Sequence, residues 1–119
     1  MVSAKIKRRK LTPAERQEVY EKTNGHCAYC GTQISIKQMQ VDHVKSLYGE
    51  NGTDTLDNML PACRSCNHYK GSCTLEVFRE TLGKMPDTLM RDSVTYKNAV
   101  RYGLVVPQPH RVIFYFEKK

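Results

Sequence analysis

The sequence Cys27-Ala-Tyr-Cys30 is followed later in the chain by a second motif of the same spacing, Cys63-Arg-Ser-Cys66. Two thiolates separated by two residues can face one ion, and two such pairs supply the tetrahedral, all-sulfur shell that Zn²⁺ prefers in structural sites. Buried cysteines without a metal are a weak alternative, because packing does not explain two pairs of identical spacing. The motifs therefore predict a structural zinc site.

The chain has 119 residues, the length of one small domain. A core of that size is modest, so a metal that joins distant segments would couple its binding to folding. The fifth cysteine, Cys73, is expected to be a spare thiol in a reducing compartment. We expect a cytoplasmic protein, because no apolar run approaches the ~18 residues of a membrane span and residues 1–10 lack the apolar centre of a signal peptide.

Positive charge is concentrated at the start of the chain, whose formal net charge is +7. Five of the 19 basic residues lie there: Lys5, Lys7, Arg8, Arg9 and Lys10. The other 14 basic residues are nearly balanced by 12 acidic ones. We expect residues 1–11 to form a flexible arm that binds phosphates independently of sequence, and a merely solubilising terminus is the alternative.

The segment between the two cysteine motifs predicts two strands and a loop. Short alternating runs at 34–36 and 39–44 are typical of half-buried strands, and the apolar run 59–62 predicts a return strand. Residues 46–57 are rich in Gly, Asn, Asp and Thr, which indicates a loop. A short helix is expected after the second motif, from residue 65 or 66 to about 71.

Helices are expected on both sides of this segment. Thr12 can cap a helix that has Pro13 in its first turn and Glu15 in a capping box, and this helix should run to about Thr23. Helical spacing predicts a second helix over 74–82 and a third over 87–102, the latter with a core stripe of Leu89, Val94 and Val100. Residues 111–117 should form a final strand or an extended arm. The result is a small α+β protein.

Asp42 and His43 are adjacent on the second predicted strand, so their side chains should point to opposite faces. The carboxylate can bind a hard cation such as Mg²⁺ or Mn²⁺, and a neutral imidazole can act as general base near pH 7. Asn67 could supply a second oxygen ligand through its amide. Asn58 could bond to the backbone around His43 and hold the base in place. For His43, a structural strand histidine is the alternative.

Basic residues near these positions are candidate phosphate contacts. Lys70 follows Asn67 by three residues and should share its helical face, and Arg64 lies in the turn of the second motif. The basic arm would add Lys7, Arg8, Arg9 and Lys10 to the nucleic-acid-binding set.

Taken in order, these motifs resemble the zinc-containing HNH endonucleases. The resemblance covers residues 25–72 and rests on these matches: Cys27-x-x-Cys30, Val41-Asp42-His43-Val44, Asp57-Asn58-Met59 and Cys63-Arg-Ser-Cys66-Asn67-x-x-Lys70-Gly71. It implies a ββα-metal, treble-clef-like core with a structural zinc site made by the four cysteines, flanked by an N-terminal helix and C-terminal helices.

The resemblance also implies roles for individual residues. His43 matches the general base, Asp42 a ligand of the catalytic metal, and Asn58 the central residue that orients the loop. The third position falls on Asn67, where many members have histidine. His68 follows one residue later, and neighbours on a helix diverge by about 100°, so only one of the two should face the metal. We favour Asn67.

We therefore expect a metal-dependent endonuclease that hydrolyses DNA phosphodiester bonds, with a structural Zn²⁺ and a catalytic Mg²⁺ or Mn²⁺. Double-stranded DNA is the expected partner, and a homodimer is one route to cutting both strands. The basic arm would cover 1–11 and a single nuclease domain 12–119, with its core at 25–72 and a helical extension at 73–119. The alternatives are a non-catalytic, zinc-finger-like module that binds nucleic acid and, less favoured, a protein-interaction zinc module.

Overall fold

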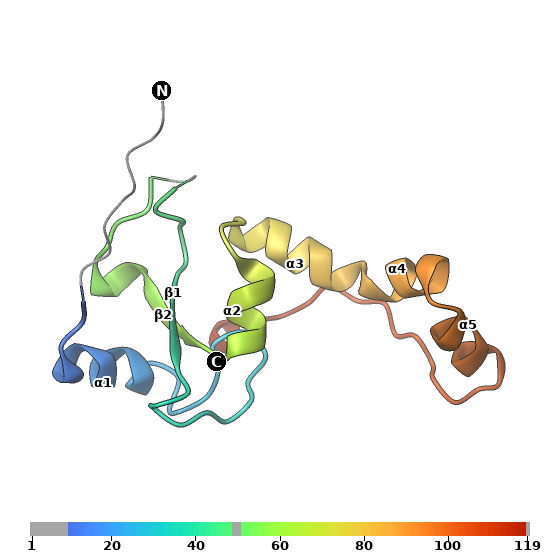
Figure 1. Ribbon diagram of the computed structural model, residues 1–119, viewed down its shortest axis with the longest axis horizontal. Coiled ribbons are helices and arrows are strands. Elements are labelled where there is room, and N and C mark those ends of the chain that lie inside the picture. Colours follow the sequence, from blue (N-terminus) through green and yellow to red (C-terminus); the bar gives the residue numbers. More distant parts are fainter. Residues whose placement is uncertain (1–9, 49–50, 119) are drawn as a thin grey trace. The chain divides into compact units, whose positions relative to one another are not determined.

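The computed structural model describes residues 10–48 and 51–118. Its helices and strands follow the order α1, β1, β2, α2, α3, α4, α5 along the chain (Figure 1). The chain divides into two compact units: Met1–Leu75 together with Phe114–Lys119, and Glu76–Ile113. The last residues thus return to the unit that contains the cysteine motifs. In the part of the chain that the structure describes, no helix has the length and apolar character needed to cross a membrane.

Helix α1, Pro13–Glu21, begins as the sequence predicts. The Thr12 hydroxyl accepts from the backbone N–H of Glu15 at 3.1 Å, and the Glu15 carboxylate accepts from the backbone N–H of Thr12 at 3.0 Å, which completes the capping box. The chain then turns through Asn24 and Gly25, whose φ angles of 53° and 81° are left-handed. This turn leads α1 directly into the first cysteine motif.

Strands β1, Gln40–His43, and β2, Met59–Ala62, form a two-stranded antiparallel sheet. Asp42 is opposite Leu60 and His43 is opposite Met59 in the register. Helix α2, Arg64–Lys70, contacts β1, while α1 contacts β2. The expected strands at 39–44 and 59–62 are confirmed, and α2 lies where the sequence predicts a short helix.

The strand expected at 34–36 is wrong. Ser35 and Gln38 close a turn in which each side chain accepts a hydrogen bond from the backbone N–H of the other. Only an isolated bridge, between His26 and Gln33, forms beside it. Ile34 is buried as expected, but in a turn, because local side-chain bonds compete with strand pairing.

The core of the first unit is a cluster of Val19, Ile34, Met39 and Met59, each at most 6% exposed. It connects α1 and the turn to the residue before β1, Met39, and to the first residue of β2, Met59. Partly buried apolar residues extend this cluster: Leu11, Tyr20, Val41, Leu56 and Cys63.

The C-terminal segment, expected to be a strand or an extended arm, forms no strand and hydrogen-bonds to the first cysteine motif. The backbone N–H of Tyr115 donates to the carbonyl of Tyr29 at 3.0 Å, and that of Phe116 donates to Ala28 at 2.8 Å. Residues Tyr115–Glu117 form a 3₁₀ turn. Gly31 allows this approach, since a Cβ there would lie 2.7 Å from the Tyr115 ring and φ is +80°.

The helices of the C-terminal half are α3, Leu75–Gly83, α4, Met85–Asp92, and α5, Val94–Arg101. Helix α3 is confirmed. The single helix expected over 87–102 is wrong, because two helices form there. Ser93 has extended backbone angles and ends α4. Its hydroxyl caps α5 by accepting from the N–H of Tyr96 at 3.1 Å. The expected core stripe is also wrong. Leu89 is 41% exposed and Val94 is 69% exposed.

In the second unit, Arg79 is the polar residue that joins α3 to the extended segment after α5. Its guanidinium donates to the Glu76 carboxylate at 3.1 Å and to the Val112 carbonyl at 2.8 Å. Arg111 also approaches Glu76, at 3.3 Å. Arg79 is 4% exposed, and its paired charge accounts for how a guanidinium can be buried here.

Candidate active site and metal centre

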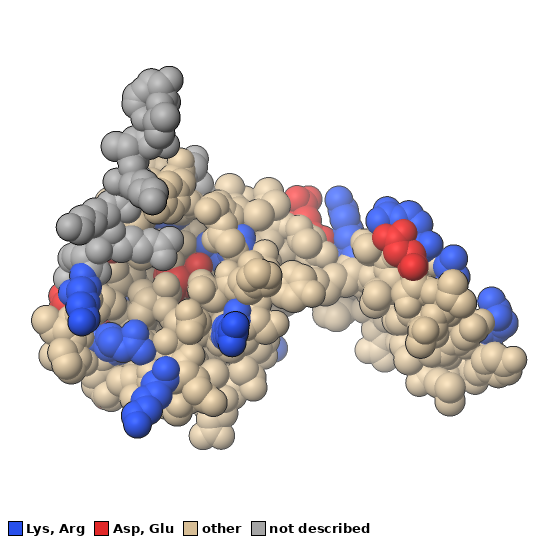
Figure 2. All heavy atoms as spheres, viewed as in Figure 1, with Lys and Arg blue, Asp and Glu red and all other residues tan. Residues whose placement is uncertain are grey.

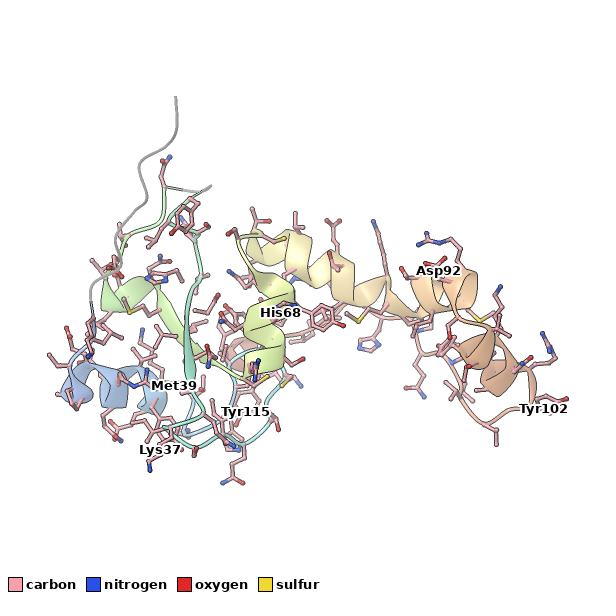
Figure 3. The ribbon with its side chains drawn as sticks, in the orientation of Figure 1. Lys37, Met39, His68, Asp92, Tyr102 and Tyr115 are labelled. Atoms are coloured by element: carbon pink, nitrogen blue, oxygen red, sulfur yellow. The ribbon has the colours of Figure 1, made fainter. Side chains whose placement is uncertain are left out.

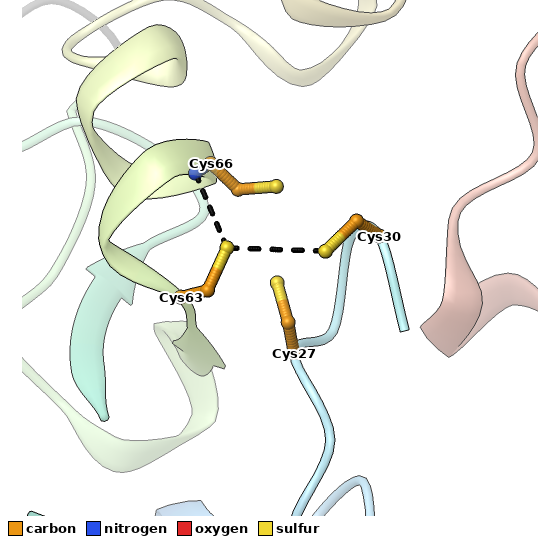
Figure 4. A group of neighbouring side chains, drawn as sticks. All are labelled: Cys27, Cys30, Cys63 and Cys66. Atoms are coloured by element: carbon orange, nitrogen blue, oxygen red, sulfur yellow. Dashed lines mark hydrogen bonds between the residues drawn. The ribbon is translucent and has the colours of Figure 1, made fainter. Parts of the chain in front are cut away.

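Four sulfur atoms converge between the first cysteine motif and α2 (Figure 4). The Sγ atoms of Cys27, Cys30, Cys63 and Cys66 all lie within 4.8 Å of one another, and those of Cys30 and Cys63 are 3.8 Å apart. A tetrahedral Zn²⁺ with Zn–S bonds of about 2.3 Å requires sulfur separations of about 3.8 Å. The four cysteines are therefore placed as one zinc ion requires.

Each cysteine pair is held by its own turn. The backbone N–H of Gly31 donates to the carbonyl of Cys27 at 3.0 Å in the first motif. In the second, Cys63 caps α2, and its Sγ accepts from the N–H of Cys66 at 3.4 Å. The two-residue spacing thus folds each pair around a tight turn. Cys73 is exposed and is not a member of the four-sulfur cluster.

The thiols of Cys27, Cys30 and Cys66 in this cluster have different pKa values. A hydrogen bond from Cys66 lowers the pKa of Cys27 to about 4, and the same bond raises the pKa of Cys66. Burial raises the pKa of Cys30. One thiolate therefore forms readily, whereas further ionisation brings negative charges together and calls for a cation, whose binding would release protons.

A cavity of about 160 Å³ lies beside the end of β1. Asp42, His43 and Asn67 line it, together with Ser46, Leu47 and the end of α2. Asp42 is 4% exposed and His43 is 9% exposed. The side chains of these neighbours were expected on opposite faces of β1. Both residues line this cavity, and His43 also lines a second cavity together with Asp54.

The carboxylate of Asp42 is fixed through one oxygen. The Tyr29 hydroxyl donates to Oδ2 at 2.5 Å, and the Lys70 ammonium lies 3.2 Å from the same atom. Burial raises the pKa of Asp42, and the contacts with Tyr29 and Lys70 act in the opposite direction. Burial also raises the pKa of Tyr29 far above its usual value, so its hydroxyl remains a donor. Because both contacts use Oδ2, Oδ1 remains for a cation.

Lys70 does not fit the expected phosphate contact. It is fully buried, and its Nζ donates to the carbonyl of His43 at 3.1 Å in addition to pairing with Asp42. The face of α2 that contacts β1 carries Lys70 inward. The ammonium therefore stabilises the end of β1 and is not exposed to a ligand.

Replacing Lys70 by methionine should lower the free energy of unfolding by about 3–5 kcal/mol, because a buried carboxylate would lose its cationic partner. Lys45→Met is the matched control, since Lys45 is exposed. Urea unfolding of the zinc-loaded proteins measures both. A loss below about 1 kcal/mol for Lys70→Met would show that the pair adds little to stability.

The imidazole of His43 has one partnered and one unpartnered nitrogen. Nε2 lies 2.8 Å from Oδ1 of Asp54, while Nδ1 is buried without a hydrogen-bond partner among the described residues. A carboxylate accepts hydrogen bonds, so Asp54 favours the tautomer with its proton on Nε2 and a lone pair on Nδ1. The sequence reasoning missed Asp54, and its only signal was a carboxylate in the loop after the base.

The side chain of Asn58 hydrogen-bonds to two points of the loop between β1 and β2, Lys45 and Thr53. Its Oδ1 accepts from the N–H of Lys45 at 2.9 Å, and its Nδ2 donates to the carbonyls of Lys45 and Thr53 at 2.9 and 2.8 Å. The loop is tight, because a Cβ on Gly52 would lie 1.8 Å from the Lys45 carbonyl oxygen. These bonds place Asp54, the residue after Thr53, beside His43.

The two candidates for the third position differ in placement. Asn67 lines the cavity, whereas His68 is exposed on α2, where its ring lies 6.3 Å from that of Tyr69 (Figure 3). Asn67, and not His68, is therefore among the residues that line the cavity with Asp42 and His43.

Basic side chains border a second, larger cavity of about 450 Å³. Lys10, Arg16 and Lys37 line it with His43 and Asp54. Arg64 is exposed and lines a different cavity beside Cys63, and Lys7, Arg8 and Arg9 lie outside the described residues. On the face in Figure 2, the Lys and Arg side chains of the described residues are scattered over the first unit and form no single patch. Lys10, Arg16 and Lys37 line the same cavity as His43 and could contact a phosphate there.

Residues 27–72 match the family model of the HNH endonucleases. These residues are therefore similar to an HNH endonuclease domain, and we call residues 27–72 the HNH domain. The HNH domain includes both cysteine motifs, the β1–β2 sheet and α2, and hence all the residues that line the small cavity.

Known proteins with similar sequences carry the same family name or the name endonuclease. The CRISPR-associated endonuclease Cas9 of Corynebacterium diphtheriae is 30% identical over 53% of this chain, and YoqL of Bacillus subtilis, named as an SPbeta prophage-derived putative HNH endonuclease, is 27% identical over 66%. The chain covers 6% and 37% of their respective lengths.

One solved structure is similar in fold to part of this chain. The Type II-C Cas9 enzyme from Actinomyces naeslundii superposes on 58% of this chain with a TM-score of 0.52 and 28% identity. The match covers 7% of that enzyme. This likeness agrees with the small α+β fold expected from the sequence.

Proposed function

We propose that this chain is a metal-dependent endonuclease that hydrolyses DNA phosphodiester bonds. The observation that supports this most directly is that Asp42, His43 and Asn67 line one small cavity within the HNH domain. Together they offer a general base and two oxygen ligands, which is the set that hydrolysis of a phosphodiester requires.

In this proposal His43 takes the proton from the water that attacks phosphorus. Nδ1 is the nitrogen that would accept it, because Nε2 is directed at Asp54. Hydrogen bonds of this kind often form only in the substrate complex. Asn58 holds the loop that carries Asp54, so its role is to keep the base in position.

Oδ1 of Asp42 and the amide oxygen of Asn67 would hold the catalytic ion. Oxygen ligands from a carboxylate and an amide suit Mg²⁺ or Mn²⁺. Such an ion, when bound, neutralises charge that develops on the phosphate oxygens. The four-cysteine cluster would hold a separate, structural Zn²⁺, and reduced thiols of this kind favour the cytoplasm as the compartment.

Double-stranded DNA is the partner we propose, and several basic residues support a nucleic-acid phosphate backbone as the ligand. Lys10, Arg16 and Lys37 border His43, Arg64 is exposed at α2, and the sequence places Lys7, Arg8 and Arg9 just before the described residues. Contacts of this type bind the phosphate backbone and weaken as salt rises. A single site cuts one strand at a time, so a double-strand break would require a dimer or two successive cuts.

The second candidate is a non-catalytic module that binds nucleic acid through its basic residues. The buried pair of Asp42 and Lys70 favours it, because a carboxylate already neutralised by an ammonium can be structural. In that case Asn67 and His43 would contribute nothing to hydrolysis.

The test is cleavage of supercoiled plasmid by the zinc-loaded chain, with no added ion, with Mg²⁺ and with Mn²⁺. We expect nicked DNA only with added Mg²⁺ or Mn²⁺, and a large loss of nicking in Asn67→Ala but not in His68→Ala. A mobility shift without nicking under every condition would support the binding module. Equal nicking by Asn67→Ala and the unaltered chain would remove Asn67 from the metal site.

A further inference from the structure

We propose that Tyr29, in the turn of the first cysteine motif, is a positioning residue that orients Asp42 for the catalytic ion, and that the C-terminal segment 114–116 holds Tyr29 in place. The inference rests on the proposed metal site at Asp42 and Asn67. It assigns a function to Tyr29, which lies between the proposed zinc ligands Cys27 and Cys30, and to the contact of the C-terminal segment with this turn.

The contact between Tyr29 and Asp42 is short and shielded from water. The Tyr29 hydroxyl donates to Oδ2 at 2.5 Å, and the two residues are 3% and 4% exposed. A hydrogen bond to a charged acceptor is stronger than one between neutral groups, and burial protects it from exchange with water. With Lys70 on the same oxygen, the carboxylate is held by two donors from two different elements.

The ring of Tyr29 is held by aromatic neighbours from the end of the chain. Phe114 and Phe116 meet it edge-on, with centroid distances of 5.2 and 6.0 Å and interplanar angles of 81° and 89°. Edge-to-face pairs at these distances are favourable beyond the area they bury. The N–H of Tyr115 donates to the Tyr29 carbonyl at 3.0 Å, so the segment holds both the backbone and the ring.

This arrangement determines which oxygen of Asp42 can bind a cation. Tyr29 and Lys70 both occupy Oδ2, so Oδ1 is directed away from them, and Asp42 lines the cavity with Asn67. Groups that hydrogen-bond a metal ligand typically change metal affinity by about 10- to 100-fold when they are removed. Loss of the Tyr29 hydroxyl would let the carboxylate rotate about its last torsion, and the ion would lose a fixed ligand.

The experiment measures Mn²⁺ binding to the zinc-loaded full chain by electron paramagnetic resonance of free Mn²⁺, without DNA. Tyr29→Phe removes only the hydroxyl. Its matched control is Tyr20→Phe, because the Tyr20 hydroxyl donates to the Ile34 carbonyl at 2.8 Å and has no contact with Asp42. Asp42→Asn identifies the Mn²⁺ that binds at this site.

We expect Tyr29→Phe to weaken the Asp42-dependent Mn²⁺ binding by about 10-fold or more, and Tyr20→Phe to change it less than about twofold. Zinc content and thermal unfolding confirm that both variants are folded. If Tyr29→Phe does not fold, Phe116→Leu keeps the hydroxyl but loosens the ring, and weaker Mn²⁺ binding in this folded variant would support the same inference.

Two outcomes would overturn the inference in distinguishable ways. Equal Mn²⁺ affinity in Tyr29→Phe and the unaltered chain would remove the positioning role and leave the proposed nuclease intact. If Asp42→Asn binds Mn²⁺ as the unaltered chain does, the ion does not bind at Asp42, and the metal site of the proposed function fails together with the inference.

Discussion

Replacing His43 by asparagine is expected to lower the rate of plasmid nicking by about 10²–10⁴-fold at saturating Mg²⁺, the usual contribution of a general base. Asparagine retains a polar side chain of similar reach, but it cannot accept a proton near pH 7. His43→Ala should show the same loss. Mn²⁺ and DNA binding should be retained in both, since neither depends on the base in the proposed mechanism. Initial rates of conversion to nicked circles measure the effect.

The control for this prediction is His110→Ala, because His110 is exposed in the second unit, outside the HNH domain. Its nicking rate should equal that of the unaltered chain. Zinc content and urea unfolding would show whether the His43 variants are folded. If a folded His43→Asn protein still nicks DNA at more than about a tenth of the original rate, His43 is not the base, and the Asp54 contact is then a structural one.

The cysteine motifs, strands β1 and β2 and helix α1 could be predicted because their signals are local. A two-residue gap between cysteines and a capping box both describe contacts within one turn, and the structure retains them. Helix α2 follows from Cys63, which serves as a zinc ligand candidate and as the cap of the helix. Much of the HNH domain could therefore be inferred from short-range patterns.

The errors came from local side-chain hydrogen bonds that compete with helix and strand formation. Ser93 looked like an interior helix residue, but its hydroxyl caps α5 and its extended backbone ends α4. Ser35 and Gln38 likewise form a turn in place of the expected strand. The spacing of apolar residues predicts a helix or a strand, but it does not show which polar side chain will end that helix or strand.

The candidate site shows the same limit at longer range. Lys70 was expected to reach a phosphate because it shares a helical face with Asn67, yet it points to Asp42 and the His43 carbonyl. Tyr29 and Asp54 were not singled out as members of the site, because they meet Asp42 and His43 only after folding. Motifs thus identified the groups that could do chemistry, while the residues that orient them required the structure.

Removing one of the four clustered cysteines, the proposed zinc ligands, should have the largest effect on the fold. Structural Zn²⁺ in small domains contributes an apparent binding free energy of about 10–16 kcal/mol, and a whole domain is stable by about 5–15 kcal/mol. Cys27 is fully buried, and all four sulfur atoms lie within 4.8 Å of one another. We therefore expect Cys27→Ala to lose its zinc and most of the ordered structure of the HNH domain.

Zinc content by atomic absorption and chemical-shift dispersion by NMR measure this loss, with Cys73→Ala as the control because Cys73 is exposed and outside the cluster. A zinc-selective chelator should unfold the unaltered chain in the same way, and Zn²⁺, but not Mg²⁺, should restore it. Nicking should return with the fold, because Tyr29 lies between Cys27 and Cys30 and connects that turn to Asp42. A metal-free Cys27→Ala protein with native dispersion would contradict this dependence of the fold on zinc.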